Sequence, residues 1–212
     1  MGEPAEVLAA IEASRLVPVI VIEDAGAAPR LAEALVAGGL RVAEVTFRTA
    51  GAQAALAAIA ADQRLLVGAG TVVRPEQVDQ AVAAGARYIV SPGFSPAVVR
   101  RCQELGVPAL PGVATATEIQ TAVAAGVEVL KFFPAEPLGG VGMLKALAAP
   151  FPGVRFVPTG GIRAAQLADY LALPSVLAVG GSWMVAAKLI EAGDWDEITR
   201  LTAEAVRLAA TS

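Results

Sequence analysis

The sequence contains no histidine, one cysteine and three lysines among 212 residues. Without histidine the chain lacks the commonest general base and the commonest zinc ligand, so catalysis would have to depend on carboxylate, amine or hydroxyl groups. We therefore expect no metal-dependent mechanism. The single cysteine, Cys102, excludes an internal disulfide and a cysteine-rich metal site, and we expect it to lie buried or half-buried in a helix.

Net positive charge and unbroken apolar segments are also scarce. The formal net charge of −4 argues against a nucleic-acid partner, which would need a basic face. The longest run without a charged residue, 170–187, is interrupted by Pro174 and by Gly180-Gly181, so we expect no membrane span. The acidic start, Met1-Gly2-Glu3-Pro4, is unlike a secretory signal. These features predict a cytoplasmic protein.

What the sequence does contain is a recurring unit, in which an Ala-rich helical stretch ends at glycine and a short apolar run follows. Glycine just past a helix adopts the left-handed conformation that closes the helix, after which the chain turns back into a strand. The predicted strands are 16–22, 41–47, 65–69, 88–90, 108–110, 128–133, 155–158 and 175–179.

Strands rich in Val, Ile and Leu, separated by helices, predict parallel pairing with both faces of the sheet covered. The most economical architecture is an α/β fold of the (β/α)8 TIM-barrel type, near the lower length limit of about 200 residues for that fold. We expect one domain over 1–212, with 1–15 as an extra helix capping the barrel floor and Asp194 as the N-cap of the last helix. An open doubly wound sheet is the alternative, but no Gly-x-Gly-x-x-Gly follows the first strand.

Lys131 stands inside an apolar strand-like run, Val129 to Ala135. Burying an ammonium group costs several kcal/mol unless it is paired or loses its proton. A neutral ε-amine can attack a carbonyl to form a Schiff base, which an arginine cannot do. Lys131 could instead lie at a strand end and extend to solvent, or pair with a carboxylate, without any catalytic role.

Polar residues gather where the predicted strands end, and this is where barrels of this type build their active sites. Strand alternation places Glu44 on one face of the second strand and Lys131 on one face of the sixth. If both faces point inward, the two side chains meet across the barrel mouth, and Arg48 would have to reach back from the rim. A buried ion pair of Glu44 with Lys131 or Arg48, without catalysis, is the alternative.

Two glycine pairs, Gly160-Gly161 and Gly180-Gly181, follow the seventh and eighth predicted strands. Barrels of this kind often bind a phosphate there through backbone N–H groups. Ser182 adds a hydroxyl donor. One glycine pair is more often a plain turn, but two pairs at these strands favour a phosphate site.

Seven motifs spread over nearly the whole chain carry a resemblance: Val17-Pro18-Val19-Ile20, Glu44-Val45-Thr46-Phe47-Arg48-Thr49, Gly68-Ala69-Gly70-Thr71-Val72, Ser91-Pro92-Gly93, Lys131-Phe132-Phe133-Pro134-Ala135-Glu136, Pro158-Thr159-Gly160-Gly161-Ile162 and Gly180-Gly181-Ser182-Trp183. Together they closely resemble the 2-keto-3-deoxy-6-phosphogluconate (KDPG) aldolase family, which also includes 4-hydroxy-2-oxoglutarate (KHG) aldolases. The resemblance implies a class I aldolase without metal or other cofactor, which cleaves KDPG to pyruvate and D-glyceraldehyde 3-phosphate. KHG, cleaved to pyruvate and glyoxylate, is the second implied substrate, and the family typically forms a homotrimer.

The resemblance also implies roles for individual residues. Lys131 matches the Schiff-base lysine and Glu44 the general acid and base. Arg48 and Thr71 match the groups that hold the substrate carboxylate, and Phe133 matches the ring that packs on the methyl or methylene carbon. The other implied substrate-binding residues are Pro92 and, at the distal hydroxyl and phosphate end, Thr159, Gly160, Gly161, Gly181 and Ser182.

Two departures from the family pattern keep alternatives open. The first strand ends in Ile22-Glu23, where some relatives have an arginine, so no phosphate contact is assigned there. Ala114 resembles the galactonate-type aldolases, whereas Thr159 matches the gluconate type, which we favour. A phosphosugar isomerase or epimerase that uses Glu44 as base and Lys131 only as a charge, and a non-catalytic phosphosugar-binding barrel, are the rival functions.

Overall fold

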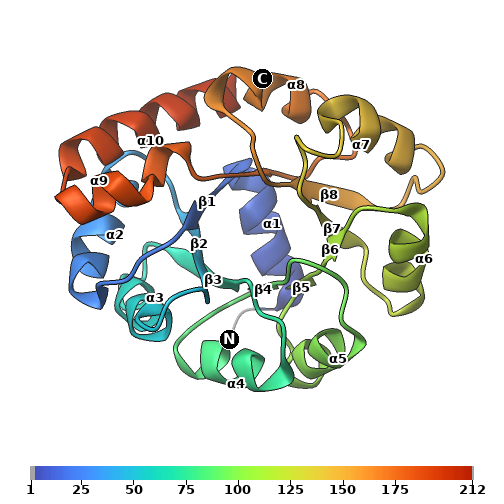
Figure 1. The fold of residues 1–212 in the computed structure, drawn as a ribbon, viewed down its shortest axis with the longest axis horizontal. Coiled ribbons are helices and arrows are strands. Elements are labelled where there is room, and N and C mark those ends of the chain that lie inside the picture. The colour runs from blue at the N-terminus through green and yellow to red at the C-terminus, as the bar shows by residue number, and fades with distance from the viewer. Residues whose placement is uncertain (1–2, 212) are drawn as a thin grey trace.

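Parallel strands occupy the centre of the molecule and helices surround them (Figure 1). The structure is a computed structural model, and it describes residues 3–211. The strands are β1 (Leu16–Ile20), β2 (Val42–Thr46), β3 (Leu66–Gly70), β4 (Ile89–Val90), β5 (Ala109–Leu110), β6 (Gly112–Val113), β7 (Val129–Phe132), β8 (Arg155–Pro158) and β9 (Val179–Gly181). The α-helices are α1 (Pro4–Ser14), α2 (Ala28–Ala37), α3 (Ala52–Ala60), α4 (Pro75–Ala83), α5 (Pro96–Leu105), α6 (Ala116–Ala124), α7 (Gly140–Ala148), α8 (Leu167–Leu171), α9 (Ala187–Ala192) and α10 (Trp195–Ala210), and short 3-10 helices cover η1 (Ala25–Ala27), η2 (Ala164–Gln166) and η3 (Trp183–Val185).

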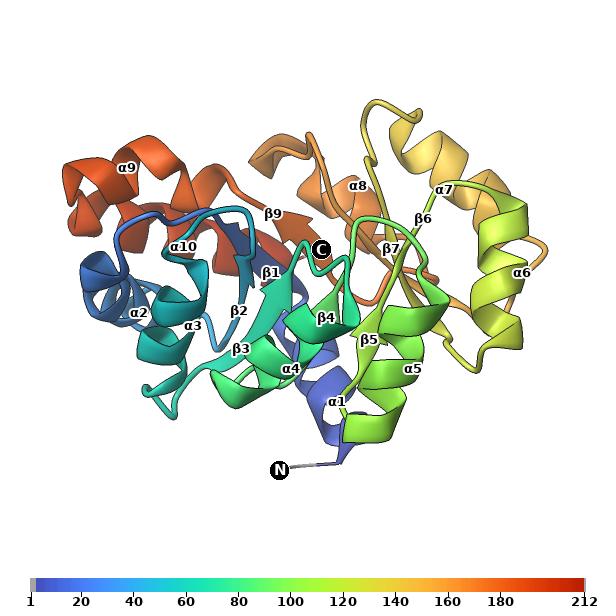
Figure 2. The ribbon, with the colours of Figure 1, turned by 60° about the horizontal axis from the view of Figure 1, so that its bottom comes forward.

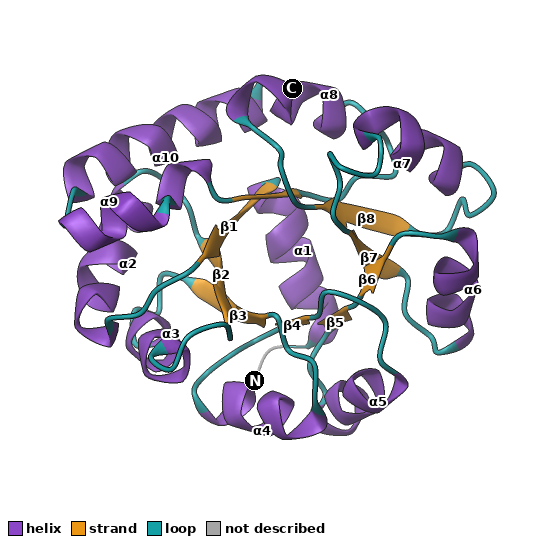
Figure 3. Ribbon diagram, viewed as in Figure 1, coloured by secondary structure: helices purple, strands orange, loops and turns teal. Residues whose placement is uncertain are grey.

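The strands form two parallel ladders, in the orders β5-β4-β3-β2-β1-β9 and β6-β7-β8. Only Pro111 separates β5 from β6 along the chain. At the other side, isolated parallel bridges pair Phe156 with Val176 and Thr159 with Gly180. The parallel pairing predicted from the sequence is therefore confirmed, and the ladders form a curled sheet with helices α2 to α10 on its outer side (Figure 3).

Side chains alternate between two apolar cores, one on each face of the strands. On β2, Ala43 and Val45 belong to the outer core between strands and helices, whereas Val42 belongs to the inner core. Helix α1 contributes Val7 and Ile11 to that inner core. Figure 2 shows α1 below β4 and β5, at the edge where the strands begin. Helix α1 thus lies at the amino-terminal ends of the strands, and loops follow their carboxyl ends. Residues 1 and 2 of the predicted helix lie outside the described residues.

Two strands differ from their predicted bounds by two residues or more, and β6 (Gly112–Val113) was not predicted as a strand. The eighth predicted strand, 175–179, is observed as β9 over Val179–Gly181, because Val179, Gly180 and Gly181 pair with Leu16, Val17 and Pro18 of β1. Gly180 and Gly181 therefore lie within the last strand and do not follow it. The first strand ends at Ile20, two residues earlier than predicted.

Two smaller sequence predictions are confirmed. Asp194 caps α10, since its carboxylate accepts a hydrogen bond from the Glu197 N–H at 3.3 Å. Cys102 lies fully buried in α5, and this burial raises the pKa of its thiol to about 12.

Among residues 3–211, no helix is both long enough and apolar enough to cross a bilayer.

Candidate active site

A cavity of about 290 Å³ opens at the carboxyl ends of the strands. Residues of β1, β2, β7 and β9 and of the loops that follow β2, β3, β4, β7, β8 and β9 line it. Every substrate-binding residue expected from the sequence lines this cavity, together with Lys131: Arg48, Thr71, Pro92, Phe133, Thr159, Gly160, Gly161, Gly181 and Ser182. Glu44 lies just below it, beside a small void of about 10 Å³ that Lys131 and Thr159 also line.

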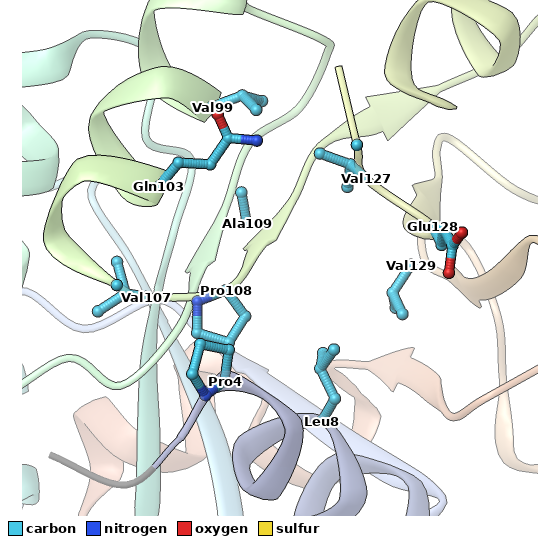
Figure 4. Close-up of a pocket in the computed structure, with 12 residues that line it drawn as sticks. Pro4, Leu8, Val99, Gln103, Val107, Pro108, Ala109, Val127, Glu128 and Val129 are labelled. Carbon is cyan, nitrogen blue, oxygen red and sulfur yellow. The ribbon is translucent and has the colours of Figure 1, made fainter. Parts of the chain in front are cut away.

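A second cavity, of about 420 Å³, lies at the opposite end of the strands, between α1, α5 and the loops that enter β5 and β7 (Figure 4). Of its described lining residues, only Gln103 and Glu128 carry polar side chains. Gln103 already donates a hydrogen bond to the Ala125 carbonyl oxygen at 2.8 Å. The smaller of these two cavities is the candidate active site, because an amine, a guanidinium group and several hydroxyls converge in it.

Lys131 and Glu44 meet inside the strand arrangement, as strand alternation predicts. The Lys131 Nζ atom lies 3.7 Å from Glu44 Oε1, and the two residues are only 6% and 3% exposed. The same Nζ atom lies 4.9 Å from the centre of the Phe133 ring. Within residues 3–211, Glu44 Oε1 makes no hydrogen bond. The amine is therefore held away from bulk water and beside a carboxylate oxygen that is available to a reacting group.

Two glycines of β3 provide the space that Glu44 and its neighbour occupy. A Cβ atom added at Gly70 would overlap Glu44 Oε1, and one added at Gly68 would overlap the Tyr88 ring. Tyr88 is fully buried, and its hydroxyl donates a hydrogen bond to the Ala43 carbonyl at 2.8 Å. Burial, with the Glu44 carboxylate nearby, raises the Tyr88 pKa well above its ordinary value. The site residues predicted from the sequence do not include Gly68, Gly70 or Tyr88, although the alternation of glycines in β3 is a usable signal.

Arg48 and Thr71 stand at the rim of the cavity. The Arg48 Nε atom donates a hydrogen bond to Thr46 Oγ1 at 3.3 Å, and that hydroxyl donates to the Ile20 carbonyl oxygen at 2.8 Å. Arg48 thus reaches back toward β2, as expected from its position. Thr71 has φ 59°, a left-handed conformation that costs a β-branched residue about 1–3 kcal/mol. Such strain is tolerated where the surrounding structure fixes the backbone to place a functional group.

Glycines of the last two strands shape the other side of the cavity. Gly160 and Gly161 have φ 105° and 81°, a backbone conformation that side chains rarely adopt, in the turn that follows β8. In β9, a Cβ atom at Gly180 would overlap Thr159 Oγ1, and one at Gly181 would overlap the Trp183 ring. The two glycine pairs therefore differ: the first forms a turn, and the second lets neighbouring side chains approach a strand closely. Among residues 3–211, no group of three or more Asp, Glu or Cys side chains is arranged to hold a metal ion.

A buried amine beside a buried carboxylate, at the carboxyl ends of parallel strands, defines a class of lysine-dependent enzymes of carbonyl chemistry on an α/β scaffold. Comparison with known proteins gives the particular family. The KDPG and KHG aldolase family model matches residues 7–201, and the chain belongs to this family.

Individual relatives agree with the family match. The chain is 52% identical over 200 residues to a 2-dehydro-3-deoxy-phosphogluconate aldolase of Treponema pallidum, covering 94% of this chain and 95% of that protein. The crystal structure of the KDPG aldolase of Zymomonas mobilis with 3-phosphoglycerate matches at TM-score 0.90 and 41% identity over 96% of both chains. That of the Legionella pneumophila KDPG aldolase, with pyruvate captured as a covalent carbinolamine, matches at TM-score 0.89 and 44% identity over 95% of this chain and 97% of that chain.

Proposed function

We propose that this protein is a class I aldolase that cleaves KDPG to pyruvate and D-glyceraldehyde 3-phosphate through an imine on Lys131. The main observation in support is the position of the Lys131 amine. It lies 3.7 Å from Glu44 Oε1 and is buried near the carboxyl ends of the strands. The family match and the carbinolamine captured in the Legionella relative support it.

The reaction follows from the chemistry of these two groups. The Lys131 amine adds to the C2 ketone of the substrate, and loss of water gives a protonated imine, which withdraws electrons from C3. Removal of the proton from the C4 hydroxyl breaks the C3–C4 bond, releases the aldehyde and leaves an enamine. Protonation of that enamine at its terminal carbon and hydrolysis of the imine then release pyruvate. Glu44 is the group placed to carry these protons, directly or through a water molecule.

The remaining cavity residues divide between the two ends of the substrate. Arg48 and Thr71 hold the keto-acid carboxylate, because a guanidinium group matches a carboxylate in charge and geometry. Phe133 packs on the substrate carbon chain beside the amine. Pro92 completes this side of the cavity, and the distal hydroxyl and phosphate end is assigned to Thr159, Gly160, Gly161, Gly181 and Ser182.

The gluconate epimer remains our preferred substrate over the galactonate epimer. Thr159 lines the cavity and is 6% exposed, so its hydroxyl can discriminate between configurations at C4. Ala114 does not line the cavity as described; its N–H donates a hydrogen bond to Glu118 Oε2 at 2.7 Å, at the start of α6. The galactonate-like residue therefore lies outside the site. KHG, which lacks the phosphate, is the proposed second substrate.

The proposal extends to the architecture. If β5 and β6 are one strand interrupted at Pro111, the chain has eight strands, and the bridges between β8 and the segment leading into β9 support a closed (β/α)8 barrel with α1 across its floor. We propose that residues 1–212 form one such domain and that it assembles as a homotrimer. The proposed partners are small phosphorylated keto acids, and no metal or other cofactor takes part.

Pyruvate release and borohydride trapping test the proposed function together. The purified protein should release pyruvate from KDPG in the presence of a chelator. Borohydride added with pyruvate should attach one pyruvate-derived group to the peptide that contains Lys131, as mass spectrometry would show. Cleavage with an unmodified Lys131 peptide would contradict the imine mechanism, and ligand binding without turnover would support the non-catalytic rival.

Replacing Gly70 by alanine should displace Glu44, because the added methyl group overlaps its carboxylate oxygen. We expect kcat for KDPG to fall by about 10² or more, the scale of losing general acid–base catalysis, while borohydride trapping at Lys131 persists. Gly142→Ala on α7 is the matched control, since an added Cβ there meets no atom within 4 Å. Equal activity of the two variants would show that Glu44 does not depend on the space at Gly70.

A further inference from the structure

Behind the turn that follows β8, three side chains form a hydrogen-bonded group outside the cavity. Glu136 follows β7, and Gln166 and Tyr170 belong to η2 and α8. Tyr170 donates a hydrogen bond to Glu136 Oε1 at 2.5 Å, and the Gln166 side-chain amide donates one to Glu136 Oε2. We name these three residues the Glu136 clamp. Its two donors use both oxygens of one carboxylate.

The clamp is connected directly to the turn that carries Gly160 and Gly161. The Gln166 side-chain oxygen Oε1 accepts a hydrogen bond from the Arg163 backbone N–H at 3.0 Å. The Glu136 N–H donates to the Gly160 carbonyl oxygen at 3.0 Å. Glu136 is therefore connected to both ends of the segment 160–163. Its backbone N–H bonds to Gly160 directly, and its carboxylate holds the Gln166 amide that bonds to Arg163.

Packing against the turn reinforces these bonds. A Cβ atom added at Gly161 would lie 2.9 Å from the Glu136 Cβ atom, so the side chain lies against the glycine with no space between them. Tyr170 is fully buried, and its burial, with the bond to Glu136, raises its pKa above the ordinary value. Gly160 and Gly161 line the cavity, whereas no clamp residue is among its described lining residues. The clamp thus acts on the turn from the side that faces away from the substrate.

We infer that Glu136, Gln166 and Tyr170 are positioning residues that hold the 160–163 turn so that its backbone can bind the substrate phosphate. This inference rests on the proposed function and deepens it. Backbone N–H groups bind an anion well only when their directions are fixed in advance, since ordering a flexible turn costs conformational entropy. Lys131 and Glu44 belong to β7 and β2, so the clamp should affect phosphate binding and leave the imine chemistry nearly intact.

Exchanging the carboxylate of Glu136 and the amide of Gln166 tests whether this hydrogen bond positions the turn. Gln166→Glu keeps the size of the side chain and its acceptor for the Arg163 N–H, but places a second carboxylate against Glu136. The double variant E136Q/Q166E restores the pairing in reverse, because the new amide donates to the new carboxylate and still accepts from Tyr170. Asp169→Asn is the control, since it exchanges a carboxylate and an amide at an exposed position of the neighbouring helix α8.

Steady-state kinetics on KDPG and on KHG should separate phosphate binding from chemistry. For Q166E we expect KM for KDPG to rise about tenfold, the scale of one or two lost hydrogen bonds, with kcat and the KM for KHG changed less than about threefold. The double variant should return KM for KDPG to within about threefold of the wild-type value, and D169N should not differ from wild type. Equal losses on KDPG and KHG, an unchanged KM, or no rescue in the double variant would overturn the inference.

Two additional measurements keep the test decisive. If thermal unfolding shows that Q166E does not fold, Tyr170→Phe removes one donor only and should raise the KM for KDPG alone by about threefold. An equal change for KHG would then count against the clamp. If the wild-type protein neither cleaves KDPG nor traps pyruvate, the proposed function fails, and calorimetry with 3-phosphoglycerate on wild type and Q166E still tests the clamp. An unchanged affinity there would overturn it independently.

Discussion

Lys131→Arg is expected to abolish both aldol cleavage and borohydride trapping of pyruvate, with kcat for KDPG lowered by about 10⁵-fold or more, the scale of removing a covalent nucleophile. Arginine retains the positive charge but its guanidinium group stays protonated and cannot form an imine. The change therefore separates an imine mechanism from one in which Lys131 supplies only charge. Stopped assays of pyruvate release and mass spectrometry of the trapped peptide give the two readouts.

The controls for this prediction use the small number of lysines in the chain. Lys188→Arg makes the same exchange at an exposed position on α9 and should retain full activity. Lys131→Met removes the amine without adding volume, so it tests the same chemistry if the larger guanidinium group disturbs the buried site. Substantial release of pyruvate by the Lys131→Arg variant would exclude the imine mechanism and show that Lys131 supplies only charge.

Glu44→Gln should leave imine formation measurable but slow the cleavage of KDPG by about 10²-fold or more, as expected for loss of a general acid and base. The amide has nearly the same shape and can still accept a hydrogen bond, but it cannot take up a proton from the C4 hydroxyl. The chain has no histidine, so no imidazole can take over the proton transfer from Glu44. Single-turnover cleavage and the rate of borohydride trapping, measured on the same preparation, distinguish the two steps.

The matched control for Glu44 is Glu76→Gln, which removes a carboxylate from the exposed first turn of α4. It should change neither step. A variant at Glu44 that cleaves KDPG at the wild-type rate would show that another group carries the proton. A variant that traps no pyruvate would mean that Glu44 is required already for addition of the amine to the ketone.

Much of this site could be predicted from the chain because strand geometry is regular. Side chains alternate along a strand, so the placement of Glu44 and Lys131 on inward faces followed from their spacing to the apolar residues around them. The carboxyl ends of parallel strands meet at one edge, so the polar residues that follow them could be expected in one cavity. Both expectations are confirmed by the 3.7 Å separation and by the shared cavity.

Other parts of the site depended on contacts that local sequence cannot show. The roles of Gly68 and Gly70 appear only when β2 and β3 are paired and Tyr88 and Glu44 occupy the space beside the glycines. The start of β9 was placed too early because a run of apolar residues does not reveal which of them pair with β1. The Glu136 clamp joins residues 30 and 34 positions apart, on elements whose orientation is set by packing.

The sequence by itself limited the kind of chemistry: without histidine, catalysis depends on amine, carboxylate or hydroxyl groups, and one lysine in an apolar strand with a carboxylate in another favours the first two. It also determined the parallel α/β organisation, because helix-closing glycines and short apolar runs act locally. The tertiary structure decided which side chains are in contact and which glycines provide space for a neighbouring side chain. The physical reason is that hydrogen bonds and steric overlaps depend on distances of a few tenths of an ångström, which are fixed only when distant strands and helices pack together.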